Sequence, residues 1–512
     1  MRRFFLLLSI QTGMLASLLG QNTVILDATA ARTTISRNIY GHFAEHLGHG
    51  IYGGIYVGDT ARNIPATRGI RNDIITALRQ LKVPVLRWPG GCFADTYHWK
   101  DGIGPRDKRP TMVNTWWGGV TEDNSFGTHE FMDLCEQIGA EPYISGNVGS
   151  GTVQELAEWV QYMNSEGKNP MSDLRRQNGR DKPWRVRYWG VANEAWGCGG
   201  NMRPEYYADV YRRYATFMTS SPDAPLFRVA SGASDDDYHW TEVMMRDIPH
   251  GLLQGIGLHH YSVIDWGKKS SATQFTEAEY FATMRQALRM DTLIRRHAAI
   301  MDRYDPRKEV ALVVDEWGGW YDPEPGTNPA FLYQQNTMRD AMIAGVTLNI
   351  FNNHCDRVRM ANLAQTVNVL QAVLLTSGEK LIRTPTYHVM EMYSVHQDAT
   401  QIPVTVKSRD YLLAGRRLPA LSVSASRDKE GRIHISLVNI DATKSQDIAI
   451  ELRGVQAAGL SGRILQAEHL QDHNTFEEPD RIRPRRFDQA RLDGSRLQLR
   501  MPPFSVVVLE VR

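Results

Sequence analysis

RYWGVANE, residues 187–194, is a mostly apolar run that ends in two polar residues, Asn193 and Glu194. Seven other short strand candidates are separated by helical segments: NIYGHFAEHLG (38–48), PVLRWPGG (84–91), EPYISGNV (141–148), FRVASGAS (227–234), GIGLHHYS (255–262), ALVVDEWG (311–318) and TLNIFNNH (347–354). Strands separated by helices pair in parallel, and eight of them predict a (β/α)8 TIM barrel of the α/β class. A doubly wound sheet is disfavoured, because the sequence contains no dinucleotide-binding or P-loop motif.

The segments between these runs carry helical periodicity. Apolar residues recur at i, i+3, i+4 and i+7 in 74–81 and in 131–138. Thr152 and Glu155 form a capping box before a third apolar face. These segments therefore predict helices that cover the barrel.

The pattern changes to strict alternation from about Met390. LSVSAS alternates, DKEG (428–431) predicts a hairpin turn, and RIHISLVNI and the closing SVVVLEV continue the strand-like pattern. This predicts a C-terminal antiparallel β-sandwich over 386–512, after a catalytic barrel over 37–385. An N-terminal strand within 22–36 is expected to join the sandwich.

The N-terminal segment has the features of a leader. Arg2 and Arg3 precede an apolar stretch, which predicts a signal peptide over 1–20 and a secreted or periplasmic location. No later stretch is apolar enough to span a membrane, so none is expected in the mature chain. The net charge of +1 gives no sign of a nucleic-acid partner.

Cysteine usage excludes a disulfide framework. The chain has four cysteines, Cys92, Cys135, Cys198 and Cys355, and no two have C-x-x-C spacing. A structural zinc site is therefore not expected, and whether Cys92 pairs with Cys198 is left open.

His42-x-x-Glu45-His46 matches an inverted zinc-protease motif. That motif needs a helix to bring both imidazoles to one face. Several glycines surround it and no N-cap precedes it, so a strand that leads into a loop fits better. In a strand Glu45 points away from both histidines, and we predict no metal there.

Two carboxylates at strand ends predict the chemistry. Glu194 ends the fourth run and Glu316 ends the seventh, so both face the same mouth of the barrel. Glycoside hydrolysis needs two carboxyl groups on opposite sides of one bond. Asn193 can hold a sugar hydroxyl beside the reacting carbon.

The ordered motifs resemble one enzyme family. YGHFAEHLG, RWPGGCFAD, NTWWGGV, WGVANEAWGCGG, LHHYS, VVDEW and RMANLAQTVNVLQA lie between about residues 39 and 371. They are similar to those of α-L-arabinofuranosidases of glycoside hydrolase family 51, in clan A. The resemblance implies the same barrel-plus-sandwich fold, no metal or other cofactor, and a homo-oligomer, often a hexamer.

The resemblance also implies roles for individual residues. Glu194 matches the acid/base and Glu316 the nucleophile. Residues expected to bind the sugar are Glu45, Cys92, Asn193, Tyr261 and Gln365, although many members have Asn at the position of Cys92. Trp116 and Trp117 either stack on the leaving group or anchor a loop, and His42, His46 and His260 are expected to be packed, hydrogen-bonded residues.

We therefore expect a retaining, exo-acting α-L-arabinofuranosidase. Its substrates would be arabinan, arabinoxylan or derived oligosaccharides with terminal non-reducing arabinofuranosyl groups. Alternatives are an endo-β-glucanase or β-xylosidase on the same scaffold, an inactive carbohydrate-binding protein, and a zinc hydrolase.

Overall fold

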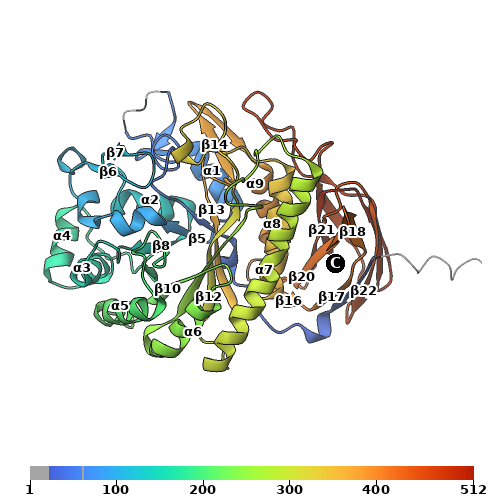
Figure 1. Cartoon of the computed structure of the whole chain (residues 1–512), viewed down its shortest axis with the longest axis horizontal. Coiled ribbons are helices and arrows are strands. Elements are labelled where there is room, and N and C mark those ends of the chain that lie inside the picture. The colour runs from blue at the N-terminus through green and yellow to red at the C-terminus, as the bar shows by residue number, and fades with distance from the viewer. Residues whose placement is uncertain (1–21, 60, 62) are drawn as a thin grey trace, which may run out of the picture.

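Eight parallel strands close into a barrel in the order in which they follow one another along the chain (Figure 1). The computed structural model describes residues 22–512 apart from 60 and 62, so the predicted signal peptide lies outside the described residues. The barrel strands are β2 (Gly41–Phe43), β5 (Val85–Trp88), β8 (Glu141–Gly146), β9 (Tyr188–Val191), β10 (Phe227–Ser234), β11 (Gly255–Ser262), β12 (Ala311–Gly319) and β13 (Val358–Ala364). The predicted TIM barrel is confirmed.

Helices cover the outside of the barrel: α1 (Asn72–Leu81), α2 (Thr128–Ile138), α3 (Val153–Asn164), α4 (Pro170–Gln177), α5 (Pro204–Phe217), α6 (Tyr238–Asp247), α7 (Glu277–Tyr304) and α8 (Met338–Asn353). The first three contain the periodic segments expected to be helical. Thr152 caps α3, because its hydroxyl accepts a hydrogen bond from the Glu155 N–H at 3.1 Å.

The position predicted for the eighth barrel strand was wrong. TLNIFNNH lies in α8, and the eighth strand is β13, a few residues further along. Residues 338–352 of α8 are all buried, because the helix lies between the barrel and the sandwich (Figure 1). A helix buried on all sides is apolar on all sides, so periodicity does not distinguish it from a buried strand.

Two sheets form the C-terminal sandwich. One has the order β17 (Val404–Lys407), β1 (Asn22–Asp27), β22 (Gln446–Arg453), β26 (Arg496–Met501), β25 (Ala490–Asp493). The other has the order β16 (Thr400–Ile402), β20 (Leu421–Arg427), β21 (Ile433–Asn439), β27 (Ser505–Val511), β23 (Leu460–Leu465), β24 (Arg485–Arg486). Only β1 and β22 pair in parallel among the described strands of this sandwich, and the N-terminal strand thereby completes it. The domain boundaries predicted at residues 37, 385 and 386 stay predictions.

The barrel and the sandwich are joined by polar as well as apolar contacts. Asn352 Nδ2 of α8 donates to Ser424 Oγ of β20 at 3.2 Å, and the Asn353 side chain donates to the Val423 carbonyl at 2.9 Å. Tyr280 of α7 donates to the Ile440 carbonyl at 2.8 Å. Helix α9 (Pro385–Tyr393) packs on α8 and leads into the sandwich.

Short hairpins complete the fold: β3 (Ala66–Thr67) with β4 (Ile70–Arg71), β6 (Met112–Asn114) with β7 (Val120–Glu122), β14 (Leu374–Ser377) with β15 (Lys380–Arg383), and β18 (Asp410–Leu413) with β19 (Arg416–Pro419). The turn between β6 and β7 contains Trp116 and Trp117, and Trp117 reaches the barrel mouth. In the described part of the chain, no helix is both long and apolar enough to cross a membrane.

Candidate active site

A pocket with about 350 Å³ of empty space opens at the C-terminal ends of the barrel strands. Its walls include most residues that the sequence singled out: Glu45, Cys92, Asn193, Glu194, Tyr261, Glu316 and Gln365. Phe43, Glu45 and Leu47 alternate along the extended chain, and all three side chains line the pocket.

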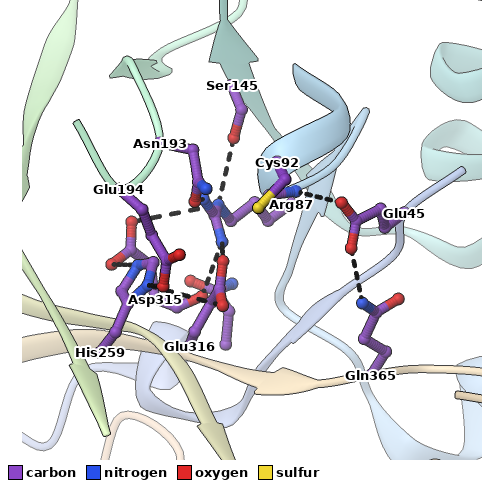
Figure 2. Close-up of polar contacts among 12 residues, drawn as sticks. Glu45, Arg87, Cys92, Ser145, Asn193, Glu194, His259, Asp315, Glu316 and Gln365 are labelled. Carbon is purple, nitrogen blue, oxygen red and sulfur yellow. Dashed lines mark hydrogen bonds and ion pairs between the residues drawn. The ribbon is translucent and has the colours of Figure 1, made fainter. Parts of the chain in front are cut away.

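Glu316 is held by two hydrogen-bond donors (Figure 2). Arg87 Nη1 donates to its Oε1 at 2.8 Å, and the Tyr261 hydroxyl donates to its Oε2 at 2.7 Å. Arg87 also donates to Asn193 Oδ1 at 2.7 Å and to Ser145 Oγ at 3.1 Å, so the guanidinium fixes three strand ends to one another. Both donors fix the orientation of the Glu316 carboxyl group.

Glu194 faces Glu316 across the pocket. One carboxyl oxygen of each lies within 4.8 Å of the other and of a His259 ring nitrogen. Burial raises the pKa of Glu194 above its ordinary value, and the charge of Glu316 adds to this, although the hydrogen bond from His259 acts the other way. Ala192 and Glu194 have positive φ values of 77° and 40°, strained for residues with side chains, as is common where the backbone aims a reactive group.

His259 links the acidic groups of the site. Its Nδ1 lies 2.8 Å from Glu194 Oε1 and 3.5 Å from Glu316 Oε2, and its Nε2 lies 3.3 Å from Asp315 Oδ1. Burial opposes a charged ring, but the charge of Glu316 and the bonds to Asp315 and Glu194 outweigh it and raise the pKa of His259 to about 10. The imidazolium and Arg87 thus place two positive charges among the carboxylates of the site.

His259, Arg87 and Asp315 were not predicted from the sequence to be site residues. His260 is a packed, hydrogen-bonded residue, as predicted: it faces away from the pocket and bonds to Asp235 and to the Gln286 carbonyl. The sequence did indicate His259, because Tyr261 was expected in the site and residues i and i+2 of a strand, here His259 and Tyr261, share a face.

Glu45 accepts four hydrogen bonds from N–H groups at the side of the pocket. The Gly91 and Phe93 backbone amides and Trp117 Nε1 donate to Oε1 at 2.9, 3.2 and 3.0 Å, and Gln365 Nε2 donates to Oε2 at 2.9 Å. Burial and then the charge of Glu316 raise the pKa of Glu45 to about 7, while these donors oppose the shift.

The histidines of the zinc-like motif lie elsewhere. The segment is strand β2 followed by a loop, and His46 packs on Phe93 with ring centroids 4.7 Å apart and accepts a bond from Trp88 at 3.1 Å. Neither histidine belongs to a cluster with metal-ligand spacing among the described residues.

Cys92 and Cys198 form a disulfide, which answers the question that the sequence left open. A disulfide sulfur carries no proton, so Cys92 offers the pocket a sulfur surface and no hydrogen-bond donor. The pocket wall contains Trp117, whereas Trp116 is exposed and does not line it. Stacking of Trp116 on a leaving group stays a prediction.

Comparisons with known proteins agree with this geometry. Residues 77–278 match the family model "Alpha-L-arabinofuranosidase 1 domain" and residues 315–505 match "Alpha-L-arabinofuranosidase C-terminal domain". An intracellular exo-α-L-arabinofuranosidase from Bacteroides ovatus is 51% identical over 492 residues, covering 96% of this chain and 95% of the relative. The chain belongs to glycoside hydrolase family 51.

Solved family 51 structures share the whole architecture. The arabinofuranosidase from Xanthomonas axonopodis pv. citri is 48% identical with a TM-score of 0.95, over 96% of this chain and all of that one. A Thermotoga maritima α-L-arabinofuranosidase solved with arabinose is 30% identical, with a TM-score of 0.84 and the same coverage. The predicted family 51 α-L-arabinofuranosidase is therefore confirmed, and the glucanase, xylosidase and inactive alternatives are not favoured.

The predicted secreted or periplasmic location was wrong. The Bacteroides relative, which aligns over 96% of this chain, is named an intracellular enzyme. The prediction depended on residues 1–20 alone, and a basic pair before a short apolar run does not by itself specify a compartment.

Proposed function

We propose that Glu316 is the nucleophile and Glu194 the acid/base of a retaining exo-α-L-arabinofuranosidase. The observation that carries this proposal is the pair of carboxyl oxygens within 4.8 Å across one pocket, because retaining enzymes hold their carboxyls roughly 5 Å apart. The surroundings support the division of roles. Arg87 and Tyr261 hold the Glu316 carboxyl group by two hydrogen bonds, and burial raises the pKa of Glu194.

The reaction then proceeds in two displacements. Glu316 attacks the anomeric carbon while Glu194 gives its proton to the departing oxygen, which leaves a covalent arabinosyl-enzyme. Glu194, now charged, takes a proton from water, and the hydroxide attacks the same carbon and releases Glu316. Two inversions return the α configuration.

Polar side chains around the pair would hold the sugar. Glu45, Asn193 and Gln365 present oxygens and N–H groups to the pocket, while Phe43, Trp117 and Trp320 supply apolar walls. The walls close around a small volume, which suits one terminal arabinofuranosyl group and therefore exo action. We propose short arabinose-containing oligosaccharides as substrates, in keeping with the intracellular relative, and a homo-oligomer, which analytical ultracentrifugation tests.

Substrate selectivity tests the function directly. The enzyme should hydrolyse 4-nitrophenyl α-L-arabinofuranoside and leave the β-xyloside and β-glucoside almost untouched, and NMR of the first product should show the α anomer. Greater activity on either β-glycoside, or a β-arabinose first product, would refute the proposed function.

The alkaline limb of kcat/KM should depend on the leaving group. The raised pKa of Glu194 keeps its proton to higher pH than an ordinary glutamic acid, and activity falls as the pH rises through that pKa. An alkyl arabinofuranoside needs this proton, whereas a dinitrophenyl arabinofuranoside does not, so only the alkyl substrate should show the Glu194 limb. If kcat/KM fell near pH 7 with both substrates, the titrating group would instead be Glu45, whose pKa is raised to about 7.

Glu45→Ala should lower kcat/KM about 10- to 150-fold. The estimate corresponds to roughly 1.5–3 kcal/mol for one charge-assisted hydrogen bond to the sugar. Steady-state kinetics measures the loss, with the exposed Glu166→Ala as a matched glutamate control. Stoichiometric zinc in the wild type, or inactivation by EDTA, would favour the zinc hydrolase instead.

A further inference from the structure

The disulfide joins two barrel loops inside the pocket. Cys92 follows β5 and Cys198 follows β9, and their α-carbons lie 5.4 Å apart. The sulfur of Cys198 is 3.6 Å from Glu194 Oε2 and 3.6 Å from Asn193 Nδ2 (Figure 2 shows Cys92 beside Asn193 and Arg87). Cys92, Cys198 and Glu194 are all partly exposed, so a dissolved thiol or ion can reach them.

These three residues have the spacing of metal ligands. The two sulfurs and a carboxyl oxygen of Glu194 all lie within 4.8 Å of one another. Two thiolates and a carboxylate, with water in the fourth position, form the open type of tetrahedral zinc site. A disulfide has no thiolate to offer, so this ligand set exists only after reduction.

A second cluster in the pocket does not compete for an ion. Glu194, His259 and Glu316 also lie within 4.8 Å of one another. Both ring nitrogens of His259 already face carboxylates, because Nδ1 lies 2.8 Å from Glu194 Oε1 and Nε2 lies 3.3 Å from Asp315 Oδ1, so neither nitrogen is free to bind a cation.

We propose that reduction of the Cys92–Cys198 disulfide creates a binding site for one thiophilic divalent cation, of the Zn²⁺ and Cd²⁺ class, with Glu194 as the third ligand. Occupation of this site inhibits the enzyme, because it removes the proton of Glu194 and fills the pocket wall where the leaving group departs. The inhibition depends on the proposed role of Glu194, whereas the binding does not.

The chemistry balances with a dissolved thiol as reductant. Two thiol molecules reduce the S–S bond to two cysteine thiols and are themselves joined as a disulfide. The cation then displaces the two thiol protons and the carboxyl proton of Glu194, which pass to solvent. Thiols stay reduced inside cells, and the 51% identical relative is named an intracellular enzyme, so the reducing condition is relevant to this family.

Cadmium titration of the oxidised and the reduced protein tests the site. The full chain is reduced with a thiol, freed of it by anaerobic gel filtration, and titrated with CdCl2. We expect one Cd²⁺ per chain in the reduced form, seen as ultraviolet thiolate-to-cadmium charge-transfer absorption, and none in the oxidised form. Activity on the aryl arabinofuranoside should fall with the same stoichiometry and return on addition of EDTA.

Variants separate this site from the other thiols. Cys198→Ser or Cys92→Ser should abolish the absorption, and Glu194→Gln should weaken Cd²⁺ binding at least about 10-fold. Cys355→Ala should bind as the wild type does, because Cys355 precedes β13 and lies at the opposite end of the barrel.

Three results would overturn the proposal. They are equal binding by oxidised and reduced protein, absorption that persists in both single cysteine variants, and binding without loss of activity. The first two reject the site, and the third rejects the proposed inhibition, while unchanged Cd²⁺ binding by Glu194→Gln would reject Glu194 as a ligand. An oxidised enzyme that lacks arabinofuranosidase activity would instead refute the proposed function and leave the absorption result intact.

Discussion

Glu316→Ala should be nearly inactive on every arabinofuranoside, with a loss in kcat on the order of 10⁴-fold or more. The carboxylate supplies the electron pair that forms the arabinosyl-enzyme, and no other group in the pocket is held by Arg87 and Tyr261 in the same way. A good leaving group should not restore activity, because the missing partner is the attacking one. Initial rates with alkyl and dinitrophenyl substrates measure this.

Azide gives this variant a diagnostic product. Azide can occupy the space left by the carboxylate and attack the α-glycoside once, so Glu316→Ala should form the β-azide and no α-azide. Glu166→Ala, which changes an exposed glutamate, should keep wild-type rates. An α-azide from Glu316→Ala would mean that the roles of the two glutamates must be exchanged.

Glu194→Ala should fail in a different manner. Without acid assistance, hydrolysis of an alkyl arabinofuranoside should slow by about 10²- to 10⁴-fold. A dinitrophenolate leaves without a proton, so the variant should still form the arabinosyl-enzyme from that substrate and then stall. Rapid mixing should show a burst of dinitrophenolate, and mass spectrometry should show the covalent adduct.

Azide should restart turnover of Glu194→Ala, since an anion needs no base. Its product should be the α-azide, because Glu316 inverts the centre once and azide inverts it again. A β-azide from this variant, together with inversion by the wild type, would show that no covalent intermediate forms and that the mechanism is assigned wrongly.

The sequence predicted the parts of this site that follow from strand geometry. Glu194 and Glu316 end apolar runs, and such runs end at one mouth of a barrel, so their meeting needed no coordinates. The zinc motif was rejected because alternation along an extended chain points Glu45 away from His42 and His46. In the structure Glu45 lines the pocket together with Phe43 and Leu47.

Other features depend on packing that a single sequence does not show. Helix α8 resembles a strand because another domain covers its outer face. Trp117, rather than Trp116, lines the pocket because the β6–β7 turn sets the direction of each ring. The Cys92–Cys198 bond depends on the approach of two loops that are 106 residues apart in sequence.

Helix α8 also limits how this protein can be divided. A binding module on a flexible linker can be lost or exchanged between enzymes without harm to its neighbour. Here the same helix packs against both the barrel and the sandwich, and the side chains of Asn352 and Asn353 donate hydrogen bonds to residues of the sandwich. Removal of the sandwich would leave an apolar helix face in water. We therefore expect that exchanging the sandwich between enzymes requires α8 to be exchanged with it.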